Sequence, residues 1–104
     1  AATLACPADY DCEVQCTATN ACAAATITCP GSYRCDVSCS GVNACASLTM
    51  DCGTSPCAID CANACPSANV NCGAEACQGV CSGNPGNNAT LNNCAGSCIC
   101  DDGC

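Results

Sequence analysis

Residues 29–45 read CPGSYRCDVSCSGVNAC, and residues 6–22 read CPADYDCEVQCTATNAC. The two stretches have the same length and agree at nine positions, including all four cysteines, so the unit repeats after 23 residues. A fixed period of this size is the sequence signature of a repeat architecture, in which each unit stacks on its neighbours. The first question is therefore what the cysteines of successive units bridge or bind.

The composition of the chain excludes a conventional hydrophobic core. The 104 residues include 19 cysteines and two tyrosines, one methionine, and no Trp, Phe or His. Burial of apolar surface is worth about 25 cal/mol per Å², so small side chains such as Ala and Cys offset little of the ordering entropy. This cysteine content predicts a disulfide scaffold, in which each bridge contributes about 2–4 kcal/mol.

Cysteine usage and charge also limit the compartment and the partners. Disulfides persist in oxidising compartments, so we expect an extracellular protein, either secreted or on a cell surface. The net charge of −8, with Arg34 as the single basic residue, argues against nucleic acid and anionic membranes as partners. No apolar run approaches the length that spans a bilayer, which predicts no membrane insertion. The opening Ala-Ala-Thr fits a mature N-terminus after signal cleavage or a fragment of a longer array.

Alignment on the cysteines divides a single predicted domain, residues 1–104, into five coils, at about 1–22, 23–45, 46–65, 66–88 and 89–104. Two short segments per unit alternate between apolar and polar residues, as in ATITC and CDVSC of the second unit. Such alternation, bounded by Pro, Gly, Ser and Asn, predicts strands. Strands that recur every 20–23 residues predict an all-β fold, namely a short disulfide-rich β-solenoid, or parallel β-helix.

Strand geometry restricts the disulfides. Cysteines four residues apart on a strand lie about 13 Å apart, whereas a bridge needs Cα atoms within about 7 Å. Bridges across the turns are preferred, although a first-to-third and second-to-fourth pattern within each coil stays open. The preferred pairs are Cys6–Cys12, Cys16–Cys22, Cys29–Cys35, Cys39–Cys45, Cys52–Cys57, Cys61–Cys65, Cys72–Cys77, Cys94–Cys98 and Cys100–Cys104. This scheme leaves Cys81 as a free thiol, buried or reactive, or as the site of an intermolecular bond.

Metal binding and catalysis are both disfavoured by the residue types present. Structural zinc sites favour C-x2-4-C pairs, often with His. The chain has no His and no C-x-x-C, and its C-x3-C pairs, such as CEVQC and CDVSC, enclose the Val or Ile of an alternating strand pattern. Without His or Lys the usual catalytic bases are missing, and the pairs Asp9/Asp11 and Asp101/Asp102 are expected to be solvated charge in turn-like or terminal stretches. A thin rod filled by cysteines has no room for a substrate pocket. We therefore expect a non-enzymatic protein with no metal and no cofactor.

The two strands of each unit present different outward residues. The first strand places small, uncharged polar residues outward, interrupted by Asp51: Thr3, Thr26, Thr28, Thr49, Asn69, Asn71 and Thr90. The second strand places most of the charge outward, with Glu13, Asp36 and Asp60, and Arg34 lies in the adjoining turn. We therefore expect the face of the second strands to carry hydrated charged side chains and the face of the first strands to carry almost none.

A threonine-rich strand face on a disulfide-stapled coil resembles the insect-type antifreeze proteins, which are small secreted β-solenoids that bind ice. Thr26-Ile27-Thr28 is the one complete T-x-T in this sequence, and Thr3 and Thr49 each match one of its positions. The resemblance implies an ice or ordered-water surface as the partner. It implies an ice-binding face made of Thr3, Thr26, Thr28, Thr49, Asn69, Asn71 and Thr90.

The repeat also resembles the cysteine-rich arrays of large secreted surface proteins, through phrases such as CSGVNAC and ATITC. That resemblance implies a structural or adhesive element. Copies of such an element would stack end to end, as a head-to-tail homo-oligomer, because an uncovered end strand invites pairing. Asn88-Ala89-Thr90 is in addition a sequon for N-glycosylation, and a glycan there would lie beside the threonine-rich face.

Overall fold

The computed structural model describes residues 3–5, 11–29, 33–94 and 100–104, with 3–5, 101 and 102 described by their backbone alone. These ranges contain ten strands and one short 3-10 helix, with no α-helix among them. The strands are β1 (Thr3–Ala5), β2 (Cys12–Cys16), β3 (Thr26–Thr28), β4 (Cys35–Cys39), β5 (Thr49–Asp51), β6 (Cys57–Ala62), β7 (Asn69–Asn71), β8 (Cys77–Ser82), β9 (Thr90–Asn92) and β10 (Cys100–Gly103), and the helix η1 is Pro85–Asn87. The prediction of an all-β chain is confirmed.

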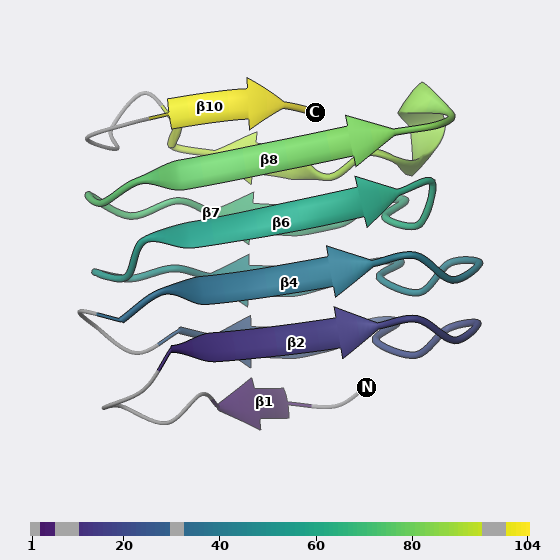
Figure 1. The fold of residues 1–104 in the computed structure, drawn as a ribbon, viewed down its shortest axis with the longest axis horizontal. Coiled ribbons are helices and arrows are strands. Elements are labelled where there is room, and N and C mark those ends of the chain that lie inside the picture. The colour runs from purple at the N-terminus through teal and green to yellow at the C-terminus, as the bar shows by residue number, and fades with distance from the viewer. Residues whose placement is uncertain (1–2, 6–10, 30–32, 95–99) are drawn as a thin grey trace.

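The strands form two parallel five-stranded sheets, as a β-solenoid requires. The first sheet has the order β1-β3-β5-β7-β9, and the second has the order β10-β8-β6-β4-β2. Figure 1 shows the second sheet in front, with its arrows nearly parallel, and the strands of the first sheet behind it, running the opposite way. We call the pair β1/β2 coil one, and so on to β9/β10, which is coil five.

The interior between the sheets is narrow and filled by one residue from each short strand. In the first sheet Ile27, Met50 and Val70 are fully buried, and in the second sheet Val37 and Ile59 face them. The cysteines that flank these residues are also buried, so sulfur and medium-sized aliphatic side chains share the core. Alternation in the strands is the cause, because successive residues point to opposite faces of a sheet.

One column of asparagines turns the chain at the end of the second sheet. Asn20, Asn43 and Asn63 have φ angles of 56°, 52° and 57°, and Asn tolerates this left-handed region better than most residues. In coil four, Gly83 takes the position of the corner asparagine, with a φ angle of 93°. Gly83 comes directly after Ser82, and Asn63 comes directly after Ala62, the strand partner of Ser82. The Asn63 side-chain oxygen accepts hydrogen bonds from the Asn84 backbone N–H at 3.0 Å and from the Asn87 amide at 2.8 Å. The corner asparagine of coil three thereby holds the loop of coil four.

The turn-spanning bridges predicted for the regular coils are confirmed. The observed pairs are Cys16–Cys22, Cys29–Cys35, Cys39–Cys45, Cys52–Cys57, Cys61–Cys65 and Cys72–Cys77. Their Cα–Cα distances lie between 5.7 and 6.0 Å. Cys12 is also disulfide-bonded, whereas Cys6, its predicted partner, lies outside the described residues. The first-to-third pattern is excluded wherever a pair is described.

The bridges predicted for the C-terminal unit are wrong. Cys94 pairs with Cys100 instead of Cys98, and Cys104 pairs with Cys81 instead of Cys100, so Cys81 is not a free or intermolecular thiol. The physical reason is register, because Cys100 begins β10 opposite Cys77 and takes the same turn position as Cys77 one coil earlier. Cys104 then follows Gly103, which is paired with Val80, and so lies next to Cys81. Cys98 lies outside the described residues.

Candidate functional site

The outward side of the first sheet collects the residues predicted for ice binding. Strand pairing aligns Thr3, Thr26, Thr49, Asn69 and Thr90 in one rank, residue for residue. The second rank, two residues further along each strand, is Ala5, Thr28, Asp51, Asn71 and Asn92. We call these two ranks the threonine face. All seven predicted residues therefore lie on it, although Thr3 is described by its backbone alone.

The two ranks are separated by buried residues. Ile27, Met50, Val70 and Leu91 are each buried at the middle position of their three-residue strands, so the flanking positions point outward. Thr28, Asn69 and Thr90 are exposed, and Thr26 and Thr49 are half-buried. Each of these five residues therefore has part of its surface open to solvent.

Three of the five residues of the second rank form a hydrogen-bonded ladder of side chains. The Asn92 amide nitrogen donates to Asn71 Oδ1 at 3.1 Å, and the Asn71 amide nitrogen donates to Asp51 Oδ1 at 2.6 Å. We call Asp51, Asn71 and Asn92 the amide ladder. Its polar groups satisfy one another along the sheet, so fewer of them remain available for an external partner.

The sequence prediction missed Asn92 as a member of the face and missed the ladder as a whole. The available signal was the recurrence of Asp or Asn two residues after each outward residue of the first rank, in TMD, NVN and TLN. In the first rank, the Asn69 amide turns back to the Ser67 carbonyl at 3.2 Å. Among the described residues, the structure gives no side-chain hydrogen bond to Thr26, Thr28, Thr49 or Thr90, so these hydroxyls face solvent unpaired.

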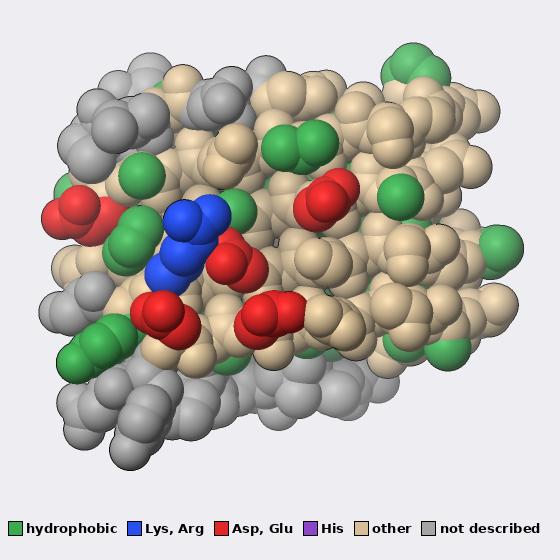
Figure 2. Space-filling view, in the orientation of Figure 1, with side chains coloured by type: hydrophobic (Ala, Val, Ile, Leu, Met, Phe, Trp, Pro, Cys, Tyr) green, Lys and Arg blue, Asp and Glu red, His purple; other side chains and the backbone are tan. Residues whose placement is uncertain are grey.

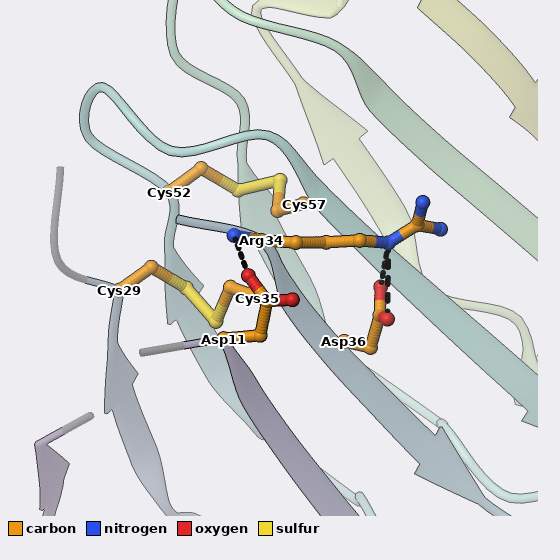
Figure 3. Close-up of polar contacts among 7 residues, drawn as sticks. All are labelled: Asp11, Cys29, Arg34, Cys35, Asp36, Cys52 and Cys57. Carbon is orange, nitrogen blue, oxygen red and sulfur yellow. Dashed lines mark hydrogen bonds and ion pairs between the residues drawn. A yellow bond between two sulfur atoms is a disulfide. The ribbon is translucent and has the colours of Figure 1, made fainter. Parts of the chain in front are cut away.

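The opposite face, on the second sheet, carries most of the described charge. Figure 2 views this face and shows Asp and Glu side chains grouped around one basic side chain. Arg34 Nε donates to both carboxylate oxygens of Asp36, at 2.9 and 3.0 Å, and the Arg34 backbone N–H donates to Asp11 Oδ1 at 3.0 Å (Figure 3). The hydrogen bond to Asp36, and then its charge, raise the pKa of Arg34.

Of the two carboxylate pairs considered above, Asp11 lies in a turn-like stretch as predicted, and Asp101 and Asp102 lie in a strand. Asp11 is exposed but accepts the Arg34 backbone N–H, so it fixes a turn, and Asp9 lies outside the described residues. Asp101 and Asp102 belong to β10, the last strand, which pairs with β8 through Asp101–Gln78 and Asp102–Gly79.

A shallow hollow of about 350 Å³ lies on this charged face, between residues of β2, β4, β6 and β8. Glu13, Asp36, Asp60 and Arg34 line it together with Val80, which is 49% exposed. The expectation that the rod has no room for a pocket was wrong for its surface, because it considered the filled interior only. The described lining includes acidic groups and one guanidinium, but no histidine, since the chain contains none.

The sulfur atoms come close enough together to suggest metal ligands, but their bonding removes that chemistry. The Sγ atoms of Cys39, Cys61 and Cys65 lie within 4.8 Å of one another. Each belongs to a disulfide, and a metal ligand must be a thiolate. The oxidised chain therefore offers no thiolate at this cluster.

The sequon asparagine is engaged inside the fold. The Asn88 amide nitrogen, to which a glycan would be attached, donates to the Cys104 carbonyl at 3.2 Å. The Oδ1 atom of Asn88 is buried and has no hydrogen-bond partner. A glycan at this position would replace one of the two hydrogens on the nitrogen that ties the loop after η1 to the end of β10.

Comparisons with protein-family models, with curated proteins and with solved structures found no match for this chain. In the part of the chain that the structure describes, no helix is long and apolar enough to cross a bilayer. The many disulfides indicate an oxidising setting.

Proposed function

We propose that the protein is a secreted, non-enzymatic ice-binding protein and that the threonine face is its contact surface. The observation that carries the proposal is the first rank, in which Thr3, Thr26, Thr49, Asn69 and Thr90 are aligned in register without a charge. Coils repeat about every 4.8 Å along the stack, and outward residues repeat about every 6.7 Å along a strand. A surface with two fixed repeats suits a partner that is itself a lattice.

The separation of charge supports the same proposal. Glu13, Asp36, Asp60 and Arg34 lie on the far sheet, and charged groups hold water strongly in their own hydration shells. On the threonine face Asp51 is the charged exception, and it accepts the Asn71 amide within the ladder. The unpaired hydroxyls of Thr26, Thr28 and Thr49 then form the central patch. The ladder limits the contribution of the second rank in coils three to five.

Thermal hysteresis of the purified protein tests this role. Thr26→Tyr places a bulky ring within the patch of unpaired threonine hydroxyls, and we expect it to abolish most of the activity because the ranks can no longer approach a flat lattice. Ser38→Tyr is the matched control, since Ser38 is a half-buried outward residue on the opposite sheet. The control is expected to retain the activity. Absence of both hysteresis and ice shaping in the parent protein, at its highest soluble concentration, would reject the proposal.

A second candidate is an extracellular structural or adhesive element that assembles end to end. It is supported by the sheet orders, in which β1, β2, β9 and β10 are outermost and each has a strand partner on one side within the described chain. An in-register copy would set Cys100 beside Cys12 but would also set Asp101 beside Glu13, a repulsive pair. Sedimentation and electron microscopy test this role, and a strictly monomeric protein at all concentrations rejects it.

A further inference from the structure

The bridges at the turn between the first and second sheets stack directly on one another. Cys57 Sγ lies 3.6 Å from Cys77 Sγ, although each is bonded to another cysteine. Since neither sulfur carries a proton, this is a contact between two disulfides and not a hydrogen bond. Figure 3 shows the preceding pair of the same column, Cys29–Cys35 and Cys52–Cys57, in successive coils.

Both ends of two neighbouring bridges have an alternative partner one coil away. Cys57 is paired in register with Cys77, and Cys52 and Cys72 follow the paired residues Asp51 and Asn71. The molecule already contains a bridge of this alternative geometry. Cys81–Cys104 joins adjacent coils with a Cα–Cα distance of 4.9 Å, which equals the spacing of neighbouring strands. A coil-to-coil bridge is therefore compatible with the spacing of neighbouring strands in this fold.

We propose that this column of disulfides is an internal exchange path, in which a catalytic small thiol converts turn bridges into coil-to-coil bridges. The exchanging pair is Cys52–Cys57 with Cys72–Cys77, and its products are Cys52–Cys72 and Cys57–Cys77. The number of disulfides is the same before and after, so the reaction needs neither an oxidant nor a net reductant. It links coil three covalently to coil four.

The thiol attacks at coil five, because the exchanging sulfurs are inaccessible. Cys52, Cys57, Cys72 and Cys77 are at most 6% exposed, whereas Cys100 is exposed and Cys94 is half-buried. A thiolate such as that of glutathione bonds to Cys94 Sγ, the Cys94–Cys100 bond breaks, and Cys100 leaves as the thiolate.

The Cys100 thiolate then lies beside its register partner Cys77. It bonds to Cys77 Sγ, the Cys72–Cys77 bond breaks, and Cys72 leaves as the thiolate. In this way the broken bond moves from the surface of coil five into the buried column.

Three further exchanges close the cycle. The Cys72 thiolate bonds to Cys52 Sγ and releases Cys57, which then bonds to Cys77 Sγ at the observed 3.6 Å contact and releases Cys100. The Cys100 thiolate attacks the mixed disulfide on Cys94, re-forms the original surface bridge and expels the small thiol unchanged. Each step breaks one S–S bond and forms one, so the thiol is a true catalyst.

Peptide mapping tests the proposal with one diagnostic fragment. An endoprotease specific for Asp and Glu cleaves after Asp51, Asp60 and Glu75, which excises residues 52–60, CGTSPCAID, as a free peptide with its own Cys52–Cys57 loop. After exchange, the same peptide is covalently attached to the fragments that hold Cys72 and Cys77. The folded protein is incubated with a trace of reduced glutathione, alkylated to stop exchange, digested without reduction and weighed.

We expect the free loop peptide to be lost with time, while the number of alkylated thiols per molecule stays constant. Cys94→Ser/Cys100→Ser removes the point of attack, and the loop peptide should then persist. Should this variant fail to fold, the order of modification in the parent protein answers the same question, with Cys100 alkylated and Cys94 carrying glutathione before any loss of the peptide. The proposal is overturned if the peptide stays free while Cys94–Cys100 opens. Links from the peptide to non-neighbouring cysteines such as Cys16 would also overturn it.

Discussion

Coils two and three and coils four and five use the same residue, cysteine, in different ways. In coils two and three every bridge closes a turn within its own coil, at a sequence separation of four to six residues. In the C-terminal part Cys81–Cys104 spans a separation of 23 residues and joins two coils. The difference shows that a sulfur bonds to the partner that register places beside it, and that sequence proximity is decisive only where a turn brings the two together.

The local cause of the change is the loop that follows β8. Coils two and three place a cysteine after the second strand, at Cys45 and Cys65, whereas coil four has the sequence SGNPGNN there and forms η1. Hydrogen bonds to Asn63 and Asn84 hold this loop in place of a disulfide. Cys81 is thus left without a partner in its own coil and bonds to Cys104 above it.

The largest effect is expected from removal of the coil-to-coil bridge by Cys81→Ala/Cys104→Ala. Chain-entropy arguments give about 3.4 kcal/mol for a closed loop of 23 residues. Urea unfolding in oxidising buffer should therefore show a large loss of stability, concentrated in coils four and five. A loss smaller than that of a single turn bridge would show that the long loop is already ordered in the unfolded chain.

Removal of one turn bridge, by Cys39→Ala/Cys45→Ala, is expected to cost less. The loop closed by this bridge has a sequence separation of only six, which corresponds to about 2.2 kcal/mol. The same urea titration, run on both double variants, gives the ratio of their two losses in free energy of unfolding directly. If the turn bridge proves the more costly to lose, packing of its buried sulfurs outweighs the entropy of the loop.

A smaller effect is expected at the corner of coil four from Gly83→Ala. The φ angle of 93° disfavours a side chain, and an added Cβ would lie 2.6 Å from the Asn63 Cβ, so we expect a loss of about 1–2 kcal/mol. Gly86→Ala is the matched control in the same loop, because its nearest contact would be Asn84 Oδ1 at 3.3 Å. Thermal unfolding monitored by circular dichroism should leave the control within about 0.5 kcal/mol of the parent protein. Equal losses would mean that the corner of coil four tolerates a side chain.

The strands and most bridges were predictable because each is a local pattern repeated with little change. Period-two alternation in TIT and CDVSC fixed the inward residues, and the spacing of Cys29, Cys35 and Cys39 fixed the turns. The last unit contains the same spacing at Cys94, Cys100 and Cys104, but Cys98 and Cys100 together concealed it. The last unit was therefore paired wrongly because Cys98 was aligned in place of Cys100, although the regular spacing is present in the sequence.

The side-chain contacts between coils were not predictable, because a single repeat does not show which residues of its neighbours it meets. The amide ladder needs Asn92, Asn71 and Asp51 to be stacked and to choose one another over solvent, which no one unit reveals. The engagement of Asn88 with the Cys104 carbonyl likewise joins segments 16 residues apart. Both features follow from the register, which the sequence indicated wherever a unit was correctly aligned on its cysteines.

The turns between the sheets vary in length while the strands remain paired residue for residue. The turn closed by Cys29–Cys35 is one residue longer than that closed by Cys52–Cys57, yet β4 and β6 keep an unbroken register. Gly53 and Thr54 are exposed at the tip of the shorter turn. A foreign peptide grafted between them would have both ends anchored by one disulfide, so the molecule is suited to display constrained epitopes in rows at fixed intervals.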